Sequence, residues 1–242
     1  MTRRRADVLL VERGLFESRA KAQAAIGAGL VSADGEPVRK ASDQLATDAD
    51  LAAEAPHPWV SRGGVKLAAA LDAFAIDPAG RLCLDLGAST GGFTDVLLAR
   101  GATKVYAVDV GHSQIHRKIA ADPRVIDLEG ADARKLTRKL VPDPIEILAS
   151  DVSFISLKLA LPPVIPLLAP DAYLVALIKP QFEAGPGRVK RGVVRDETVH
   201  RAVCDDLARF VEALGFGVLG LIPSPILGGA GNREFLIGAR RG

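Results

Sequence analysis

Short apolar runs alternate with amphipathic stretches from residue 65 onward. The apolar runs, at about 81–87, 104–110, 124–129, 145–151 and 172–179, predict five strands, and the stretches between them predict helices. Another helix is predicted at about 196–214. Strands that alternate with helices are typical of a parallel sheet with right-handed crossovers. We therefore expect an α/β domain over residues 65–242.

The last two apolar runs break this alternation. Residues 217–223 and 234–239 are separated by about ten residues without a helical pattern. A parallel pair needs a longer crossover connection, so these two strands are predicted to pair in the antiparallel direction. We expect them to close the sheet.

The first 55 residues have shorter elements. Residues 6–14 predict a helix that ends at Gly14, and Ser18 is a candidate N-cap for a helix over residues 19–27. Asp34-Gly35 lies between two short apolar runs and predicts a β-hairpin. Two prolines and two glycines mark residues 56–64 as a linker. A small α+β domain at residues 3–55 is therefore predicted to precede the α/β domain.

Composition places the chain among ordinary globular proteins, with 242 residues, 48% hydrophobic and 25% charged. Its two cysteines, Cys83 and Cys204, have no metal-binding spacing, so no metal site is predicted and reduced thiols in the cytoplasm are expected. The N-terminus has no apolar core of the signal-peptide kind. The most apolar window, residues 159–178, contains an acid and four prolines, which disfavours a membrane span.

The distribution of charge is more informative than the net charge of +2. Basic residues gather in the first 40 residues and again at residues 188–195. Each cluster is either a solvated face or a nucleic-acid contact. The candidate RNA-binding residues are Arg3, Arg4, Arg19, Lys21, Gln23, Arg39 and Lys40 in the first cluster and Arg188, Lys190 and Arg191 in the second.

A glycine-rich turn, Asp85-Leu-Gly-Ala-Ser-Thr-Gly-Gly-Phe93, follows the first strand of the α/β domain. Glycines allow a ligand to approach main-chain N–H groups closely, and doubly wound sheets bind nucleotides at this edge. The turn departs from the G-x-G-x-x-G pattern of dinucleotide sites. Asp85 suits a cationic amino-acid tail and would repel a pyrophosphate.

Two further acids follow the next strands. Asp109 closes the second strand, where a carboxylate can accept both ribose hydroxyls. Asp132 follows the third strand, where it can accept from an adenine amino group or cap a helix. Together with the terminal hairpin, these features resemble class I S-adenosylmethionine methyltransferases, which have a Rossmann-like seven-stranded sheet with an antiparallel last strand. The candidate cofactor-binding residues are Asp85, Gly87, Ala88, Ser89, Gly91, Gly92, Phe93, Asp109, Val110, Asp132 and Ala133.

The methyl acceptor has to be identified from other residues. The fourth strand ends at Asp151 without the Asn/Asp-Pro-Pro-aromatic turn of amine methyltransferases, and neither cysteine lies in a strand-end loop. The fifth strand ends at Lys179. A ribose hydroxyl is a poor nucleophile until it is deprotonated, and a lysine amine can take its proton if burial or a second cation lowers the pKa of that amine. Lys66 is the candidate second cation, while Asp151 and Glu234 can each hold one lysine.

In chain order, Lys66, Asp151, Lys179 and Glu234 resemble the catalytic tetrad of the FtsJ-like 2′-O-methyltransferases. The segments Ser18-Arg-Ala-Lys-Ala-Gln-Ala-Ala-Ile26 and Gly29-Leu-Val-Ser-Ala-Asp-Gly35 resemble an S4-type RNA-binding domain. With Ser-Arg-Gly-Gly-Val-Lys-Leu and Ile-Lys-Pro-Gln-Phe-Glu, nearly the whole chain resembles the TlyA family.

This resemblance implies S-adenosylmethionine-dependent 2′-O-methylation of cytidine in ribosomal RNA, with Lys179 as the base. It implies the large ribosomal subunit as the favoured partner, with no membrane and no obligate protein partner. Two alternatives stay open, a non-catalytic ribosome-assembly factor and a membrane-active hemolysin, the name historically given to the family. A pseudouridine synthase is disfavoured because we find no Arg-Leu-Asp turn.

Overall fold

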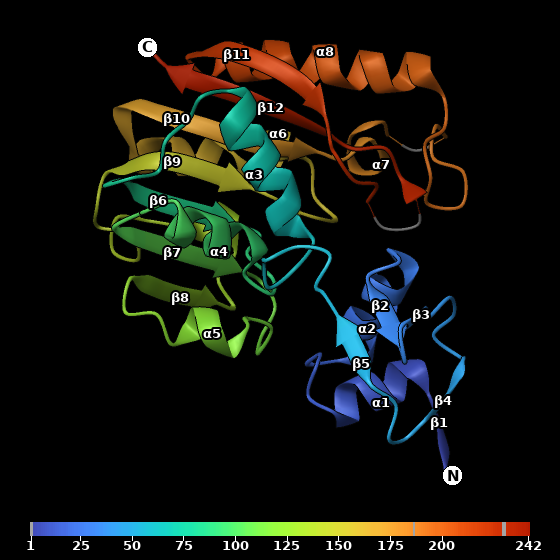
Figure 1. Cartoon of the computed structure of the whole chain (residues 1–242). Helices are drawn as coiled ribbons and strands as arrows, with labels where there is room; N and C mark the ends of the chain where they lie inside the picture. The colour runs from blue at the N-terminus through green and yellow to red at the C-terminus, as the bar shows by residue number, and fades with distance from the viewer. Residues whose placement is uncertain (1, 186, 229–230) are drawn as a thin grey trace. The chain divides into compact units, whose positions relative to one another are not determined.

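The computed structural model describes residues 2–185, 187–228 and 231–242 (Figure 1). The chain forms two compact units, Met1–Pro58 and Trp59–Gly242. Within the described residues, no helix combines the length and apolar character needed to cross a membrane.

The smaller unit has two helices and two small sheets. Its elements are β1 (Arg3–Arg5), α1 (Ala6–Glu12), α2 (Arg19–Gly27), β2 (Val31–Ala33), β3 (Glu36–Pro37), β4 (Gln44–Ala46) and β5 (Leu51–Ala53). Ser18 caps α2 as predicted, since its Oγ accepts from Lys21 N at 3.3 Å. The predicted hairpin joins β2 and β3, and both of its turn residues, Asp34 and Gly35, have positive φ angles. The pairs β1–β4 and β2–β5 were not predicted.

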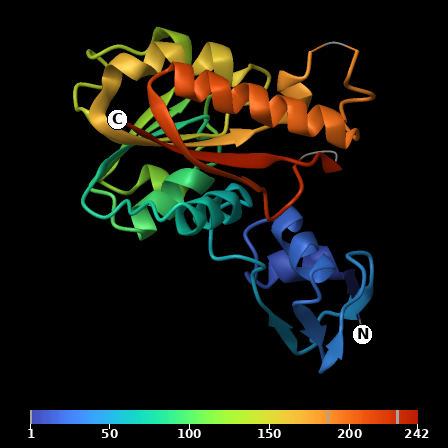
Figure 2. The ribbon, with the colours of Figure 1, turned by 90° about the horizontal axis from the view of Figure 1, so that it is seen from above.

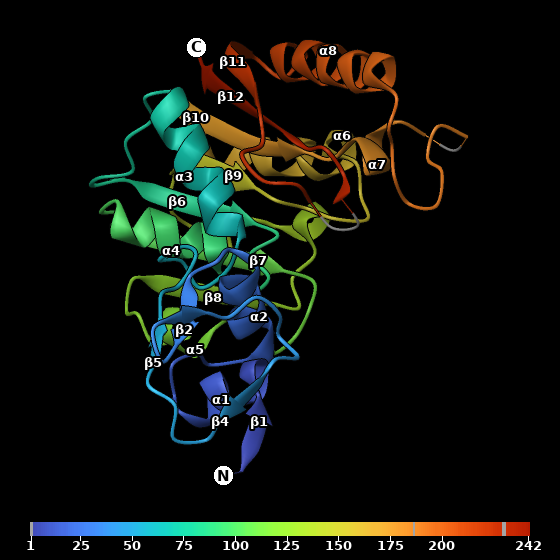
Figure 3. The same ribbon diagram turned by 45° about the vertical axis from the view of Figure 1, so that its right-hand side comes forward.

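The larger unit is built on a seven-stranded sheet in the order β11-β12-β10-β9-β6-β7-β8 (Figures 1 and 3). The strands are β6 (Leu82–Leu86), β7 (Lys104–Asp109), β8 (Val125–Glu129), β9 (Ile145–Ser150), β10 (Leu168–Ile178), β11 (Phe216–Pro223) and β12 (Phe235–Arg241). The first five are parallel, and β12 runs antiparallel to both β10 and β11. The predicted α/β class, including the terminal antiparallel pair, is confirmed.

Helices cover both faces of this sheet (Figure 2). One apolar cluster lies under α3 (Gly63–Ala73), α4 (Gly92–Ala99) and α5 (Arg117–Ala120), and the other lies under α6 (Leu157–Ala160), the 3₁₀ helix η2 (Pro162–Leu167) and α8 (Glu197–Ala213). Short helices η1 (Ala133–Lys135) and α7 (Pro180–Glu183) follow β8 and β10. Because α3 begins at Gly63, it includes the last two residues of the predicted linker.

The strand order places one part of the sheet edge at the centre of the fold. Connections leave β6 and β9 toward opposite sides, so the carboxyl ends of these neighbouring strands form the topological switch point at which α/β folds bind ligands. The antiparallel pairing of Ile178 with Phe235 brings the start of β12 to the same edge. Lys179 and Glu234 are therefore neighbours although they are 55 positions apart in the sequence.

Candidate active site

The glycine-rich turn packs its backbone against the end of β9. Gly87 and Gly91 have φ angles of +88° and +90°, which favour glycine. A Cβ atom on Gly87 would lie 2.8 Å from the backbone oxygen of Asp151. The close approach of these two strand ends therefore depends on a residue without a side chain.

Asp85 lies beneath this turn and is completely buried. Its Oδ2 accepts from Thr94 N at 2.9 Å and Thr94 Oγ1 at 2.7 Å, whereas its Oδ1 has no hydrogen-bond partner among the described residues. Burial raises the pKa of Asp85 to about 7, and the nearby acids Asp151 and Asp109 act in the same direction. An orphaned buried acceptor of this kind fits a donor that arrives with a ligand.

Two carboxylates shape the loop that follows β7. Asp109 accepts from the backbone N–H groups of Ser89 and Gly111, both at 2.8 Å. Glu129, at the end of β8, accepts from three successive N–H groups of residues 113–115 at 2.6–3.0 Å, and these bonds lower the pKa of Glu129. Glu129 was not among the residues predicted from the sequence. Its three bonds are visible only once the loop has folded back over β8.

Asp132 caps η1, which is one of the two roles predicted for it. Its Oδ1 accepts from Arg134 N at 2.9 Å, and its Oδ2 pairs with the Arg134 guanidinium at 2.7 Å. The hydrogen bonds from Arg134 hold the pKa of Asp132 at about 2. Asp132 also lines the main cavity, so its side chain has both a structural partner and access to a ligand.

The main cavity has a volume of about 1130 Å³. It extends along the sheet edge, because residues after β7 and β8 line it together with residues after β9 and β10. A second cavity of about 360 Å³ lies between the turn and the start of α3. The two cavities share Gly87, Ser89 and Asp151.

Most of the candidate cofactor-binding residues line these cavities. The main cavity includes Gly87, Ser89, Asp109, Val110, Asp132 and Ala133, and the second includes Gly87, Ala88, Ser89, Gly92 and Phe93. Asp85 and Gly91 lie behind the lining rather than in it.

The four tetrad residues form two ion pairs, of which Lys66–Glu234 is buried, whereas in Lys179–Asp151 the acid is 20% exposed. Lys179 Nζ lies 2.6 Å from Asp151 Oδ1, and Lys66 Nζ lies 2.5 Å from Glu234 Oε2. Both lysines are 9% exposed and Glu234 is 3% exposed. The four side chains come from the ends of β9 and β10, the start of β12 and the first turns of α3.

The two pairs influence each other electrostatically. Burial raises the pKa of Asp151, the positive charges of Lys179 and Lys66 oppose this rise, and the negative charge of Glu234 adds to it. Lys179 Nζ also donates to Ser153 Oγ at 2.6 Å. Lys66 and Asp151 line the second cavity. Lys179 lines neither cavity, but it contacts Asp151 and Ser153, which line the main cavity.

An exposed aromatic side chain stands at the main cavity. Phe154 is 90% exposed and has a φ of 64°, which is unfavourable for a bulky side chain. Its ring lies 5.1 Å from that of Phe182, at an interplanar angle of 51°. Gln181 also lines the cavity, and its buried Oε1 has no hydrogen-bond partner in the described part of the chain.

Ser153, Phe154, Gln181 and Phe182 were not predicted from the sequence, although all four follow the ends of strands β9 and β10. The sequence feature that could have identified them as site residues is their position directly after a predicted strand.

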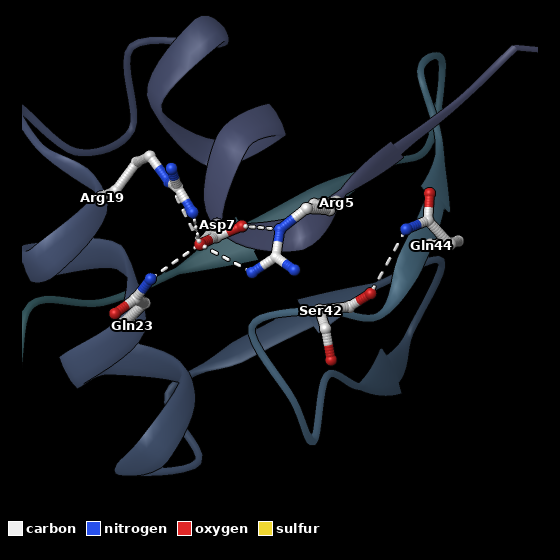
Figure 4. Close-up of polar contacts among 6 residues, drawn as sticks. All are labelled: Arg5, Asp7, Arg19, Gln23, Ser42 and Gln44. Atoms are coloured by element: carbon white, nitrogen blue, oxygen red, sulfur yellow. Dashed lines mark hydrogen bonds and ion pairs between the residues drawn. The ribbon is translucent and has the colours of Figure 1, made fainter.

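In the smaller unit, two of the predicted RNA-binding residues are engaged by a buried acid (Figure 4). The Asp7 carboxylate is fully buried and accepts from Arg5 at 3.0 Å, Arg19 at 2.8 Å and Gln23 at 2.7 Å. The hydrogen bond from Arg5 is the main cause that holds the pKa of Asp7 well below its usual range. The Arg19 side chain is still 56% exposed, so Asp7 fixes its position without removing it from the surface.

The other predicted RNA-binding residues lie at or near the surface. Lys21 is half-buried and pairs with Glu17 at 2.7 Å. The remaining side chains are exposed, namely Arg3, Arg4, Arg39 and Lys40 in the smaller unit and Arg188, Lys190 and Arg191 in the larger one.

Comparison with known proteins shows two family matches. Residues 59–241 match the FtsJ-like methyltransferase family, and residues 4–51 match the S4 domain. The 16S/23S rRNA (cytidine-2′-O)-methyltransferase TlyA of Mycobacterium tuberculosis is 44% identical, over 98% of this chain and 90% of the relative.

Solved structures agree with these matches. A protein of Streptococcus thermophilus named as a hemolysin has 40% identity and a TM-score of 0.78, covering 100% of this chain and 89% of its own. A protein of Listeria monocytogenes named as an S-adenosylmethionine dependent methyltransferase has a TM-score of 0.52 at 16% identity, over 74% of this chain and 98% of its own. This last likeness concerns the fold alone.

Proposed function

Because the chain belongs to the TlyA family of FtsJ-like methyltransferases, we propose that it methylates the 2′-hydroxyl of a cytidine in ribosomal RNA, with S-adenosylmethionine as the methyl donor. The smaller unit, with its S4 match, is the RNA-binding part, and the larger unit performs the transfer. The protein thus acts where ribosomes are assembled, in the cytoplasm.

The observation that carries this proposal is the presence of two ion pairs at the switch point of the sheet, in which three of the four side chains are buried and Asp151 is half-buried. Burying two lysines and two acids costs desolvation energy that their mutual attraction repays only partly. Replacing them with apolar residues would be less costly for the fold. Their presence beside the glycine-rich turn therefore supports a chemical role, and it disfavours a purely RNA-binding assembly factor.

The residues around the turn fit the cofactor. S-adenosylmethionine supplies a methyl group on a sulfonium, which an oxygen nucleophile can displace. Asp85 Oδ1 has no donor among the described residues and lies behind the cavity lining, so it would accept from the α-ammonium group once the glycine-rich turn shifts to expose it. Asp109 would accept from the ribose hydroxyls, because each of its oxygens has one donor in the described part of the chain. Val110, 67% exposed in the main cavity, offers an apolar contact to the adenine.

Lys179 is the proposed base. Its Nζ now donates to the hydroxyl of Ser153 at 2.6 Å, and the acceptor 2′-hydroxyl would take the place of this partner. The proton that Lys179 carries can pass to Asp151 Oδ1, 2.6 Å away, because burial makes Asp151 a better proton acceptor than an exposed acid. The neutral amine then accepts the hydroxyl proton as the oxygen bonds to the methyl carbon. Lys66, held by Glu234, would stabilise the negative charge that develops on the oxygen.

Phe154 is proposed to stack on the base of the acceptor nucleotide. A ribose inside a helix is poorly accessible, so an enzyme that modifies it gains from an aromatic surface that holds the unstacked base. Phe154 offers such a surface, because its ring is exposed and lines the same cavity as Asp151 and Ser153. Its positive φ is the kind of local strain that is found at functional sites.

Two substitutions of Lys179 test its role separately from its charge. Lys179→Met removes the amine, and Lys179→Arg keeps the positive charge but provides a group that does not lose its proton. Ribosomal RNA from a strain that lacks the gene serves as acceptor under single-turnover conditions, with Lys158→Met as the control. We expect both Lys179 variants to lose activity by about 10²–10⁴-fold. Near-normal activity of Lys179→Arg would refute the base assignment. Parallel reactions with 23S and 16S rRNA test the expectation that the large subunit is the substrate.

A further inference from the structure

A third cavity, of about 640 Å³, lies between residues 187–195 and the first turns of α8. Three cationic side chains line it, those of Arg188, Lys190 and Arg195. None of the three forms an ion pair with an acid in the described part of the chain. Concentrating uncompensated positive charge in a concave surface creates an attractive potential for anions.

One acid, Asp196, also lines this cavity. Its Oδ1 accepts from Thr198 N at 2.8 Å and Thr198 Oγ1 at 2.7 Å, which makes it the N-cap of α8. These bonds lower the pKa of Asp196, so it stays anionic and offsets one of the three cations. The lining therefore keeps an excess of positive charge.

The backbone that carries these cations is held in place by buried side chains. Asn232, 3% exposed, donates through Nδ2 to Gly192 O at 2.9 Å and accepts at Oδ1 from Val194 N at 3.2 Å. His200, 4% exposed, has its Nε2 3.0 Å from Val194 O. A binding segment that is already fixed loses less conformational entropy when a ligand arrives.

One residue of the same segment, Val189, also lines the main cavity. Gly185 and Val189 line the main cavity, whereas Arg188 and Lys190, on either side of Val189, line the basic one. Asn232, which holds the segment, precedes Glu234 of the tetrad by two residues. An RNA strand with one nucleotide in the main cavity would thus have its neighbouring phosphates close to the basic cavity.

We propose that this basic cavity binds a backbone phosphate of the RNA strand, next to the nucleotide that is methylated. This inference rests on the proposed function. A guanidinium matches two phosphate oxygens at once and an ammonium adds a compact charge, so the lining suits a phosphate. The site includes Arg195, which was not predicted from the sequence to bind RNA, and excludes Arg191, which was.

The test compares Arg188→Gln, Arg195→Gln and the double variant with Arg209→Gln, which removes an exposed arginine farther along α8. Binding of rRNA from the gene-deletion strain is measured at several salt concentrations, together with the KM for RNA in methyl transfer. Removing one phosphate-binding cation should lower the slope of log K against log salt by about 0.7–0.9, so the slope of the double variant should fall by about twice that amount. S-adenosylmethionine affinity and thermal unfolding serve as the folding controls and should not change.

Three results would overturn the proposal. One is an unchanged salt slope and KM in the double variant, and another is an equal loss in Arg209→Gln, which would indicate a general charge effect. The third is a double variant that binds RNA as well as wild type but no longer binds an acidic protein, because the ligand of the cavity would then be the protein and not RNA. If the wild-type protein binds RNA but transfers no methyl group, the proposed function is wrong. The salt dependence of RNA binding in the variants then still tests whether the basic cavity binds a phosphate.

Discussion

Because of Asp85, we predict that a rise in pH strengthens cofactor binding but lowers the stability of the free protein. Its carboxylate is completely buried, Thr94 satisfies only one oxygen, and its pKa is about 7. If the free oxygen accepts from the ammonium group of S-adenosylmethionine, the anion is the form that binds. Cofactor binding should therefore strengthen as the pH rises through 7.

The size of this effect follows from the pKa. Between pH 8 and pH 6, a group with a pKa of about 7 changes from about nine-tenths to about one-tenth ionised, so the affinity should fall by up to about tenfold. Folding responds in the opposite direction. The folded pKa lies above the ordinary 3.8, so the free protein loses stability as the pH rises from about 4 to about 7, by at most about 4 kcal/mol.

The assay is titration calorimetry of S-adenosylmethionine at pH 6, 7 and 8, in two buffers that differ in ionisation enthalpy. Wild-type protein should release about half a proton on binding near pH 7. Asp85→Asn should bind more weakly at pH 8, show little pH dependence, and unfold at a higher temperature than wild type above pH 7. Binding that does not vary with pH and releases no proton would refute the assigned contact, and so would an Asp85→Asn variant with wild-type affinity.

Three more substitutions probe separate parts of the site. Gly87→Ala should weaken S-adenosylmethionine binding in calorimetry, because its Cβ would lie 2.8 Å from the backbone oxygen of Asp151. The control Gly80→Ala should not weaken binding, because Gly80 has a similar φ of +75° but no atom within 4 Å of the added Cβ. Phe154→Ala should raise the KM for RNA by the loss of about 1–3 kcal/mol of stacking, and Phe154→Trp should restore it; equal KM values would contradict stacking. Glu234→Gln leaves Lys66 buried without its counter-charge and should destabilise the protein by about 3–5 kcal/mol in urea unfolding; a loss below about 1 kcal/mol would show that Lys66 finds another partner.

Much of the fold could be predicted because the central strands are buried on both faces and therefore appear as continuous apolar runs. The runs at 81–87 and 145–151 correspond to β6 and β9 within about one residue. The strands of the smaller unit behave differently. β1 consists of three exposed arginines, whose extended backbone depends on pairing with β4 and not on their own pattern. No local signal predicts such a strand.

The candidate site was predictable where chemistry coincides with a strand end. Asp151 and Lys179 end adjacent strands, so the sequence placed them at one edge. Which lysine pairs with which acid was left open, because the answer depends on the register between β10 and β12 and on the position of α3. Phe154 was missed because its exposure and positive φ arise from the path of the loop after β9.

Transfer of a methyl group to a ribose 2′-oxygen of ribosomal RNA can be measured directly. Ribosomal RNA from the gene-deletion strain is incubated with the purified protein and S-adenosylmethionine that carries a deuterated methyl group, then digested to nucleosides and analysed by mass spectrometry. The proposed reaction yields a single labelled product, 2′-O-methylcytidine, which wild-type protein should form and Lys179→Met should not. Label on a base, label on another nucleoside, or no labelled RNA would contradict it.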